Sequence, residues 1–329
     1  MYGQPGTRLI LTGYSFSKGK NVIGRLMTTD GSALAQVRLT GPSAKNFFLS
    51  ADHELSIRPS LNRPGVLWYD VMIEATAGGQ PLKQPFRIVH DEFRRNKVIA
   101  HRGAWKASGT AENSIAALKN AISLGCQGSE FDVHMSADSL LFINHDPSIQ
   151  GLVIEKTPAS KLSELRLSNG EPLPSLEQFL KAGLGQNHTR LVLEIKPTTL
   201  GADRARYVAA SVLQAVRDLH AEAWIDYISF DFDICRELVR LDPSARVAYL
   251  NGDKSPAELA ASKLWGLDYH YSVFKKNEAL IPEARAHHLT LNAWTANDRE
   301  TMNWLLQNGF DFITTNEPEL LLQMTDSPE

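Results

Sequence analysis

The stretch KVIAHRGAWKASGTAENSIAALKNAISLG, residues 97–125, decides the interpretation of the fold. A short apolar run leads into His101 and Arg102, and a loop of small residues follows. We expect a helix to begin near Ala111, with Thr110 as its N-cap. A buried strand that passes through a polar turn into a helix is typical of the first unit in an alternating β/α pattern.

The same alternation continues to the end of the chain. Eight short apolar strands can be counted after residue 96, separated by helical stretches such as ADRARYVAASVLQAVRDLH. The expected strands read KVIAHRG, SEFDVHM, TRLVLEIKP, DYISF, ARVAYLNG, DYHYSVF, LTLNAWT and DFITTNEP. Eight such units favour an α/β fold, a closed (β/α)8 TIM barrel over residues 96–329, with an open doubly wound sheet as the alternative. No glycine-rich dinucleotide loop follows the first strand, which favours the barrel.

One apolar run does not fit this count. The run LLFINHD, residues 140–146, begins only four residues after EFDVHM ends. A parallel neighbour requires a connection of about a dozen residues or more. We therefore expect this run to fold back as a hairpin on the second strand, beyond the rim of the barrel.

Residues 1–95 have a different pattern. Short alternating, β-branched or aromatic runs such as RLILTGYSF and VLWYDVMIEATAGG are separated by turn sequences such as TTDGS and AGGQP. This spacing predicts a small all-β antiparallel sandwich as a separate accessory domain. The stretches FFLSADHELSI and WYDVMIEATAGG are loosely similar to cadherin-like and immunoglobulin-like modules.

Composition excludes several classes of protein. The 329-residue chain has a net charge of −3 and no long basic stretch, so a nucleic-acid partner is not expected. No apolar run approaches the ~18 residues of a transmembrane helix. Cys126 and Cys235 lack metal-ligand spacing and are interpreted as buried thiols. The N-terminus lacks the features of a signal peptide, so we expect either a cytoplasmic protein or an exported one whose leader is absent from this sequence.

Polar side chains follow the predicted strands at their carboxyl ends, where barrel enzymes place their active sites. These side chains are His101, Arg102, Glu130, Asp132, His145, Asp146, Glu194, Lys196, Asn292, Trp294, Thr314 and Asn316.

Three carboxylates among them predict a metal site. Glu130 and Asp132 are two residues apart on one strand, so they share a face roughly 6.6 Å apart. Glu194 occupies the equivalent level on the next strand. Three converging carboxylates repel one another unless a cation lies between them, and hard oxygen ligands favour Mg²⁺ or Ca²⁺ over zinc. The competing interpretation is that one or two of them form ordinary surface ion pairs.

The remaining side chains suit a phosphodiester. Histidines from separate segments could flank a bound ester, one activating the nucleophile and the other protonating the leaving oxygen. Arg102 and Lys196 are suited to binding a phosphate anion. A divalent cation, two cationic side chains and an acid/base pair together make a phosphodiester-cleaving site.

The catalytic part of the chain resembles the glycerophosphodiester phosphodiesterases over about residues 97–322. The resemblance rests on short motifs in the right order: HRG, AENS, EFDV, HD, EIK, NAW and ITTNEP. It implies hydrolysis of glycerophosphodiesters to glycerol 3-phosphate and an alcohol on a (β/α)8 barrel. It also implies an insertion after the second strand, which would be residues 147–188 and would cap the mouth of the barrel.

By position, the resemblance implies roles for single residues. His101 and His145 would be the general acid/base pair. Glu130, Asp132 and Glu194 would hold one divalent cation, Ca²⁺ or Mg²⁺. The residues expected to contact substrate are Arg102 and Lys196 at the phosphate and Trp294 at the alcohol or glycerol side. Supporting roles are expected for Glu112 and Asn113, on the helix that begins near Ala111, and for Phe230 beside the glycerol pocket.

Two other functions remain open at this stage. The barrel could act on intact phospholipid, as a phospholipase C or D does, although residues 147–188 are only modestly apolar. Alternatively, the chain could be a binding protein in which the sandwich does the work. An immunoglobulin-like module ahead of such a barrel suggests, by analogy, a periplasmic or cell-surface location and a cell-envelope partner for the sandwich. The substrate is expected to be a small molecule.

Overall fold

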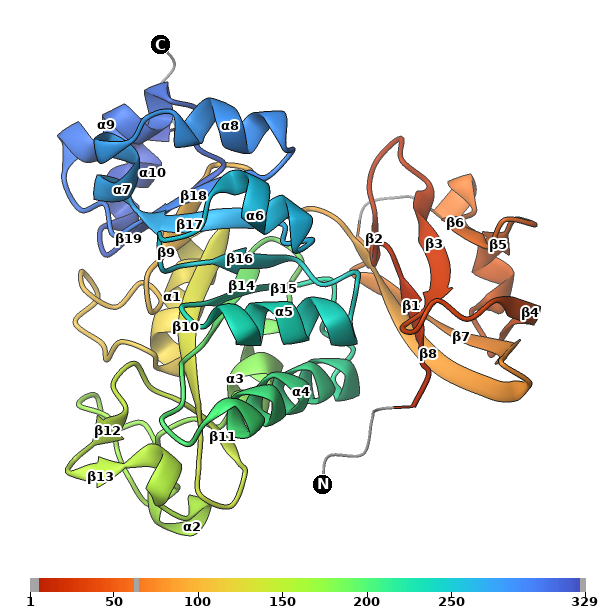
Figure 1. The fold of residues 1–329 in the computed structure, drawn as a ribbon, viewed down its shortest axis with the longest axis horizontal. Helices are drawn as coiled ribbons and strands as arrows, with labels where there is room; N and C mark the ends of the chain where they lie inside the picture. Colours follow the sequence, from red (N-terminus) through yellow and green to blue (C-terminus); the bar gives the residue numbers. More distant parts are fainter. Residues whose placement is uncertain (1–5, 62–64, 326–329) are drawn as a thin grey trace.

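The computed structural model describes residues 6–61 and 65–325, which form a strand-rich part and a barrel (Figure 1). In Figure 1 the strand-rich part lies to the right of the barrel. Within the described ranges no helix has the length and apolarity needed to cross a bilayer.

The strand-rich part consists of two four-stranded sheets that share one apolar core. One sheet has the order β1-β3-β6-β5 and the other β2-β8-β7-β4. The strands are β1 (Leu9–Leu11), β2 (Ser15–Phe16), β3 (Val22–Thr28), β4 (Leu34–Thr40), β5 (Phe47–Leu49), β6 (Glu54–Ile57), β7 (Trp68–Ala77) and β8 (Gln80–His90), with 3-10 turns η1 (Ala44–Asn46) and η2 (Pro59–Leu61). Pairing is antiparallel except for β2, which lies parallel to β8.

Eight parallel strands close the predicted TIM barrel. Their order is β9-β10-β14-β15-β16-β17-β18-β19, and pairing of β19 with β9 completes the ring. The strands are β9 (Val98–Ala100), β10 (Gly128–Met135), β14 (Arg190–Ile195), β15 (Ile225–Ser229), β16 (Val247–Tyr249), β17 (Gly266–His270), β18 (Thr290–Trp294) and β19 (Phe312–Thr315). Every residue of β10 and β14 is buried, as expected for strands covered on both faces.

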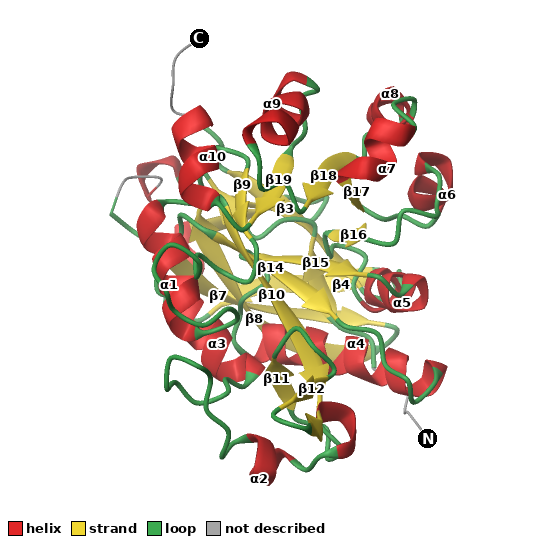
Figure 2. Ribbon diagram, turned by 90° about the vertical axis from the view of Figure 1, so that its left-hand side faces the viewer, coloured by secondary structure: helices red, strands yellow, loops and turns green. Residues whose placement is uncertain are grey.

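Helices surround these strands, as Figure 2 shows in a view turned by 90°. They are α1 (Ile115–Leu124), α2 (Ala159–Leu162), α3 (Leu176–Gly183), α4 (Ala202–Asp218), α5 (Phe232–Leu241), α6 (Pro256–Ala261), α7 (Tyr271–Lys276), α8 (Leu280–Ala286), α9 (Arg299–Gln307) and α10 (Pro318–Thr325). Several begin at a polar N-cap. Ser175 and Ser255, for example, form reciprocal capping boxes at α3 and α6, which satisfies backbone donors that the helix cannot.

Two predicted boundaries were wrong. Helix α1 begins at Ile115 rather than near Ala111, because the Ser114 side chain caps it by accepting from the backbone N–H of Ala117. The predicted sixth strand, DYHYSVF, is half strand and half helix: β17 ends at His270, whose ring accepts from the N–H of Ser272 and so caps α7.

The predicted hairpin is present. Strand β11 (Leu141–Ile143) pairs antiparallel with the end of β10, with Val133 opposite Ile143. The segment beyond β11 holds the small hairpin β12 (Ser148–Ile149) and β13 (Leu152–Val153), the 3-10 turn η3 (Ile154–Lys156) and α2. The last part, α3, buries Leu176 and Phe179 in the main core as an ordinary barrel helix.

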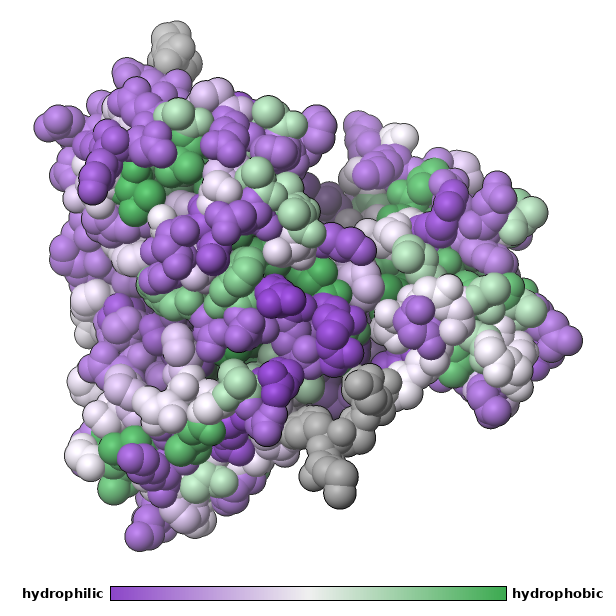
Figure 3. Space-filling view, in the orientation of Figure 1, coloured by the Kyte–Doolittle hydropathy of each residue, from purple (hydrophilic) through white to green (hydrophobic). Residues whose placement is uncertain are grey.

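The sandwich packs against the amino-terminal ends of barrel strands. Trp68 of β7 meets Trp224, just before β15, edge to face at a centroid distance of 6.1 Å. Phe93, in the connecting segment, packs on the same indole. The Asn187 amide, before β14, donates to the carbonyl of His90 at 2.6 Å. The face of the barrel seen in Figure 3 is largely hydrophilic, with small apolar areas.

Candidate active site

The turn after β9 positions the first pair of polar side chains. Arg102 has a left-handed backbone (φ 56°), and its N–H donates to Oε2 of Glu130 at 2.8 Å. Gly103 follows with φ 80°, and its Cα lies so close to α1 that an added Cβ would stand 2.7 Å from the carbonyl carbon of Ala117. Only glycine fits this close approach, so the turn is fixed by backbone packing.

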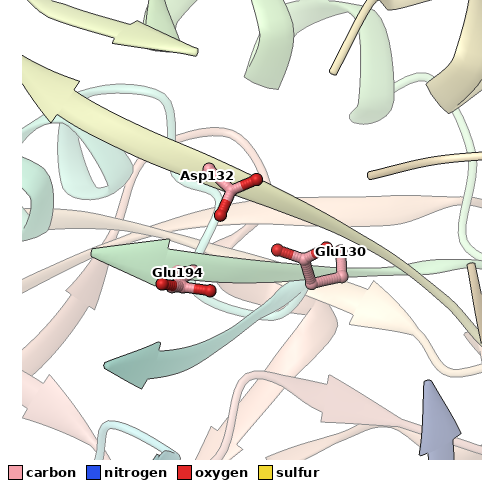
Figure 4. A group of neighbouring side chains, drawn as sticks. All are labelled: Glu130, Asp132 and Glu194. Atoms are coloured by element: carbon pink, nitrogen blue, oxygen red, sulfur yellow. The ribbon is translucent and has the colours of Figure 1, made fainter. Parts of the chain in front are cut away.

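The three predicted metal-binding carboxylates come together. Asp132 of β10 lies directly beside Glu194 of β14 in the strand register, and Glu130 lies two residues earlier on β10. Each offers an oxygen within 4.8 Å of the others, and all three residues are buried. Figure 4 shows the three carboxyl groups pointing toward one another from the two adjacent strands.

The pKa shifts of Glu130 and Glu194 indicate that the cluster lacks a further positive charge. Burial, Asp132 and Glu194 raise the pKa of Glu130 well above its usual value. Burial also raises the pKa of Glu194, and Asp132 adds to the effect. Lys196 contacts Asp132 at 3.2 Å and Glu194 at 2.7 Å, but Oε1 of Glu130 has no hydrogen-bond partner. Three buried carboxylates, one of which has an oxygen without a partner, fit a divalent cation that prefers oxygen ligands.

The two predicted histidines lie on the same cavity. Nδ1 of His101 donates to Oδ1 of Asn316 at 2.8 Å, which leaves Nε2, 3.9 Å from Oε2 of Glu130, without a proton. Burial, aided by the Arg102 charge, lowers the pKa of His101 to about 4. Nδ1 of His145 donates to the Asp146 carboxylate at 2.8 Å. Both rings are therefore oriented through Nδ1, and Nε2 is the atom free for chemistry.

The two predicted phosphate-binding cations stand beside the carboxylates. Nη1 of Arg102 donates to both carboxylate oxygens of Glu112, each at 3.0 Å, while its Nε is buried without a hydrogen-bond partner. Although burial opposes it, the carboxylates of Asp132 and Glu194 raise the pKa of Lys196. Lys196 therefore carries its positive charge at neutral pH.

Predicted supporting residues have defined contacts. Asn113 lies in the loop before α1 and not on the helix, and its amide donates to Oδ2 of Asp132 at 2.8 Å. Phe230 and Trp294 meet edge to face at a centroid distance of 5.4 Å. The Trp294 indole N–H donates to the backbone carbonyl of Asp268 at 2.8 Å.

A cavity of about 110 Å³ joins these groups at the carboxyl ends of the strands. Its lining residues are His101, Arg102, Glu130, His145, Glu194, Lys196, Ile228, Phe230, Leu250, Asp268, Trp294, Thr295 and Thr314. None of its lining residues belongs to 147–188, so capping of the mouth by this segment stays a prediction. The segment closes over a small core around Phe142 and Leu162.

Sequence reasoning missed Asp268 as a site residue. The predicted strand ran from residue 268 to 274, which placed Asp268 at the amino-terminal end, far from the mouth. In the structure β17 runs from Gly266 to His270, so Asp268 lies mid-strand and faces the cavity. Correct strand bounds would have revealed it.

Comparison with known proteins agrees with this geometry. The sequence profile of the glycerophosphoryl diester phosphodiesterase family matches residues 101–320. The chain belongs to this family. The family match confirms the prediction of a phosphodiesterase enzyme.

Solved structures and named relatives of this family align with most of the barrel. A crystal structure of a glycerophosphodiester phosphodiesterase from Parabacteroides distasonis is 42% identical, covers 71% of this chain and 97% of its own, and superimposes with a TM-score of 0.68. An Oleispira antarctica phosphodiesterase, solved in complex with the product sn-glycerol-3-phosphate, is 25% identical, covers 70% of this chain and 97% of its own, and has a TM-score of 0.60. The glycerophosphodiester phosphodiesterase of Caldanaerobacter subterraneus is 26% identical over 245 residues, which are 69% of this chain and 96% of the relative.

Proposed function

We propose that the chain hydrolyses glycerophosphodiesters to sn-glycerol 3-phosphate and an alcohol, with one divalent cation and two histidines. The proposal rests on one observation. Two imidazoles, a cluster of three carboxylates and two cationic side chains lie together at one small cavity, at the carboxyl ends of the strands in a barrel of this family. The product complex of the Oleispira relative supports the substrate class.

Glu130, Asp132 and Glu194 would hold the cation, either Ca²⁺ or Mg²⁺. A bound divalent cation supplies charge stabilisation for the phosphoryl oxygens. Arg102 and Lys196 add two positive charges on the same side of the cavity, which offset the charge that develops on the phosphorane-like transition state.

The histidine environments suit opposite roles. His101 is neutral near pH 7, because burial lowers its pKa to about 4, so its Nε2 would take the proton from the attacking hydroxyl. His145 donates through Nδ1 to Asp146, and this hydrogen bond orients the ring so that its Nε2 would protonate the leaving alcohol oxygen. A P–O bond forms to the nucleophile and the P–O bond to the alcohol breaks. The nucleophile is either water or a glycerol hydroxyl, the latter giving a cyclic phosphate that product analysis would detect.

The experiment supplies glycerophosphocholine, glycerophosphoethanolamine, glycerophosphoinositol and intact phospholipid, and measures sn-glycerol 3-phosphate. We expect turnover of the soluble diesters, its loss on chelation, and its return with Ca²⁺ or Mg²⁺. His101→Asn and His145→Asn should each lower kcat by about 10²–10⁴-fold, whereas His287→Asn, at the C-cap of α8, should not. Turnover of intact lipid alone would favour the phospholipase, and no turnover of any diester would favour a binding protein.

A further inference from the structure

Asp268 faces the metal-binding carboxylates from the opposite wall of the barrel. In the ring of eight strands, β17 lies four positions from β10 in either direction, so the two strands are diametrically opposed. Asp268 is 2% exposed and lines the same cavity as Glu130. A substrate whose phosphate lies near Arg102 and Lys196 would therefore extend across the barrel toward Asp268.

One oxygen of this carboxyl group lacks a partner. Within residues 6–61 and 65–325 Asp268 forms no ion pair, and its Oδ1 has no hydrogen-bond partner. Oδ1 of Asn292, its neighbour in the strand register, is also unpaired. Burial raises the pKa of Asp268 to about 7, and a hydrogen bond from the Asn292 side chain opposes the change. A buried carboxyl oxygen without a partner is costly, and such groups are commonly kept for a ligand.

The surroundings indicate which ligand group would satisfy it. A second metal ion does not fit, because the described residues place three ligating side chains together only at Glu130, Asp132 and Glu194. A cationic headgroup is a poorer fit, because burial raises the pKa of Asp268 to about 7 and so leaves this carboxyl group only partly charged at neutral pH. The remaining candidates for this ligand group are uncharged hydrogen-bond donors. A phosphodiester of a polyol carries such donors in its alcohol hydroxyl groups.

We propose that Asp268 accepts a hydrogen bond from a hydroxyl group of the glycerol portion and thereby restricts the enzyme to diesters of polyols. The inference rests on the proposed function and specifies how its substrate is chosen. A site built to bond a hydroxyl discriminates strongly against an analogue that lacks it, since the buried acceptor is then left unpaired.

The test compares two inhibitors, sn-glycerol 3-phosphate and n-propyl phosphate, which share the phosphate and the three-carbon chain and differ in two hydroxyls. For the wild-type holoenzyme we expect at least ~10-fold tighter inhibition by glycerol 3-phosphate. Asp268→Leu, which keeps the branched shape of the side chain but has no oxygen to accept a hydrogen bond, should reduce this ratio to within about threefold by weakening only glycerol 3-phosphate. Asp203→Leu, with a side chain 94% exposed on α4, should keep the wild-type ratio.

Steady-state kinetics distinguish a role of Asp268 in substrate recognition from a role in the folded structure alone. Asp268→Leu should raise KM for glycerophosphodiesters while kcat/KM for bis(p-nitrophenyl) phosphate, which has no hydroxyl, stays within about threefold of wild type. Equal losses on both substrates would overturn the proposal, as would a wild-type enzyme that binds the two inhibitors equally. If Asp268→Leu fails to fold, Asp268→Ala and the wild-type ratio still decide. Failure of the proposed function would look different: the wild type would then turn over no glycerophosphodiester at all.

Discussion

At the scale of single residues, Asn113 connects the turn after β9 to the carboxylate cluster. Its side-chain amide donates to Oδ2 of Asp132 at 2.8 Å, and its Oδ1 accepts from the Asp132 N–H at 3.2 Å. Asn113 is buried and has a left-handed backbone with φ 58°. Groups that orient a metal ligand in this way commonly tune metal affinity.

Asn113→Gly should therefore weaken metal binding. Glycine keeps the left-handed backbone without strain and removes only the amide. We expect the Ca²⁺ or Mg²⁺ concentration for half-maximal activity to rise about 10–100-fold, with a smaller change in kcat at saturating metal. Metal titration of activity, together with isothermal titration calorimetry on the resting enzyme, measures the effect.

The matched control is His288→Gly, because His288 has the same φ of 58° but lies just after α8, away from the cavity. Unchanged metal affinity in Asn113→Gly would show that Asp132 is oriented without the amide.

At the scale of elements, the site depends on how closely the β9–α1 turn packs on α1. This turn carries Arg102, and Gly103 lets it approach the helix backbone. The strand and the helix are thereby held at a fixed distance, which places the Arg102 N–H on Glu130. A shift of the turn would move both Arg102, the proposed phosphate ligand, and Glu130, a proposed metal ligand.

Gly103→Ala should disrupt this contact. Besides the cost of φ 80°, the new Cβ would lie 2.7 Å from the Ala117 carbonyl carbon. We expect a loss of about 1–3 kcal/mol beyond the backbone cost, and at least a tenfold loss of kcat/KM because Arg102 moves. Chemical denaturation and steady-state kinetics measure the two effects.

Gly109→Ala is the matched control, since Gly109 has φ 65° but no atom within 4 Å of its added Cβ. It should show the backbone cost alone and nearly normal activity. If the two variants behave alike, the close packing of the turn is not what positions Arg102.

At the scale of the whole molecule, the sandwich and the catalytic cavity lie at opposite ends of the barrel. A second cavity of about 110 Å³ lies between the two parts, lined by Tyr14, Glu222 and Asp242 among others. Glu222 is partly exposed as a residue, yet burial of its carboxyl group, aided by the Asp242 charge, raises its pKa to about 8. We therefore expect the stability of the protein to depend on pH through this group.

Glu222→Gln should remove that sensitivity. The unfolded chain loses the Glu222 proton near pH ~4.3, whereas the folded protein keeps it up to about 8. Stability from this group is therefore full below pH ~4.3 and is lost as pH rises toward 8. We expect Glu222→Gln to exceed the wild type by about 1–2 kcal/mol at pH 8.5, a value reduced for solvent screening, and to match it at pH 4.

Thermal unfolding at both pH values, with Glu278→Gln at an exposed position between α7 and α8 as control, checks this expectation. A wild type and Glu222→Gln whose stability difference is the same at pH 4 and pH 8.5 would contradict the assigned pKa.

The sequence alone determined the barrel, the hairpin of β11 and the list of polar side chains at the strand ends. These features follow from local periodicity, since parallel buried strands are apolar throughout and their polar ends stand out. Only the tertiary structure decided that α3 is a barrel helix and that β17 ends at His270. It alone brought Asn113 to Asp132 and placed Asp268 opposite β10. Those facts depend on contacts between residues distant in the chain, where closure of the ring and the close approach of backbones override local sequence preference.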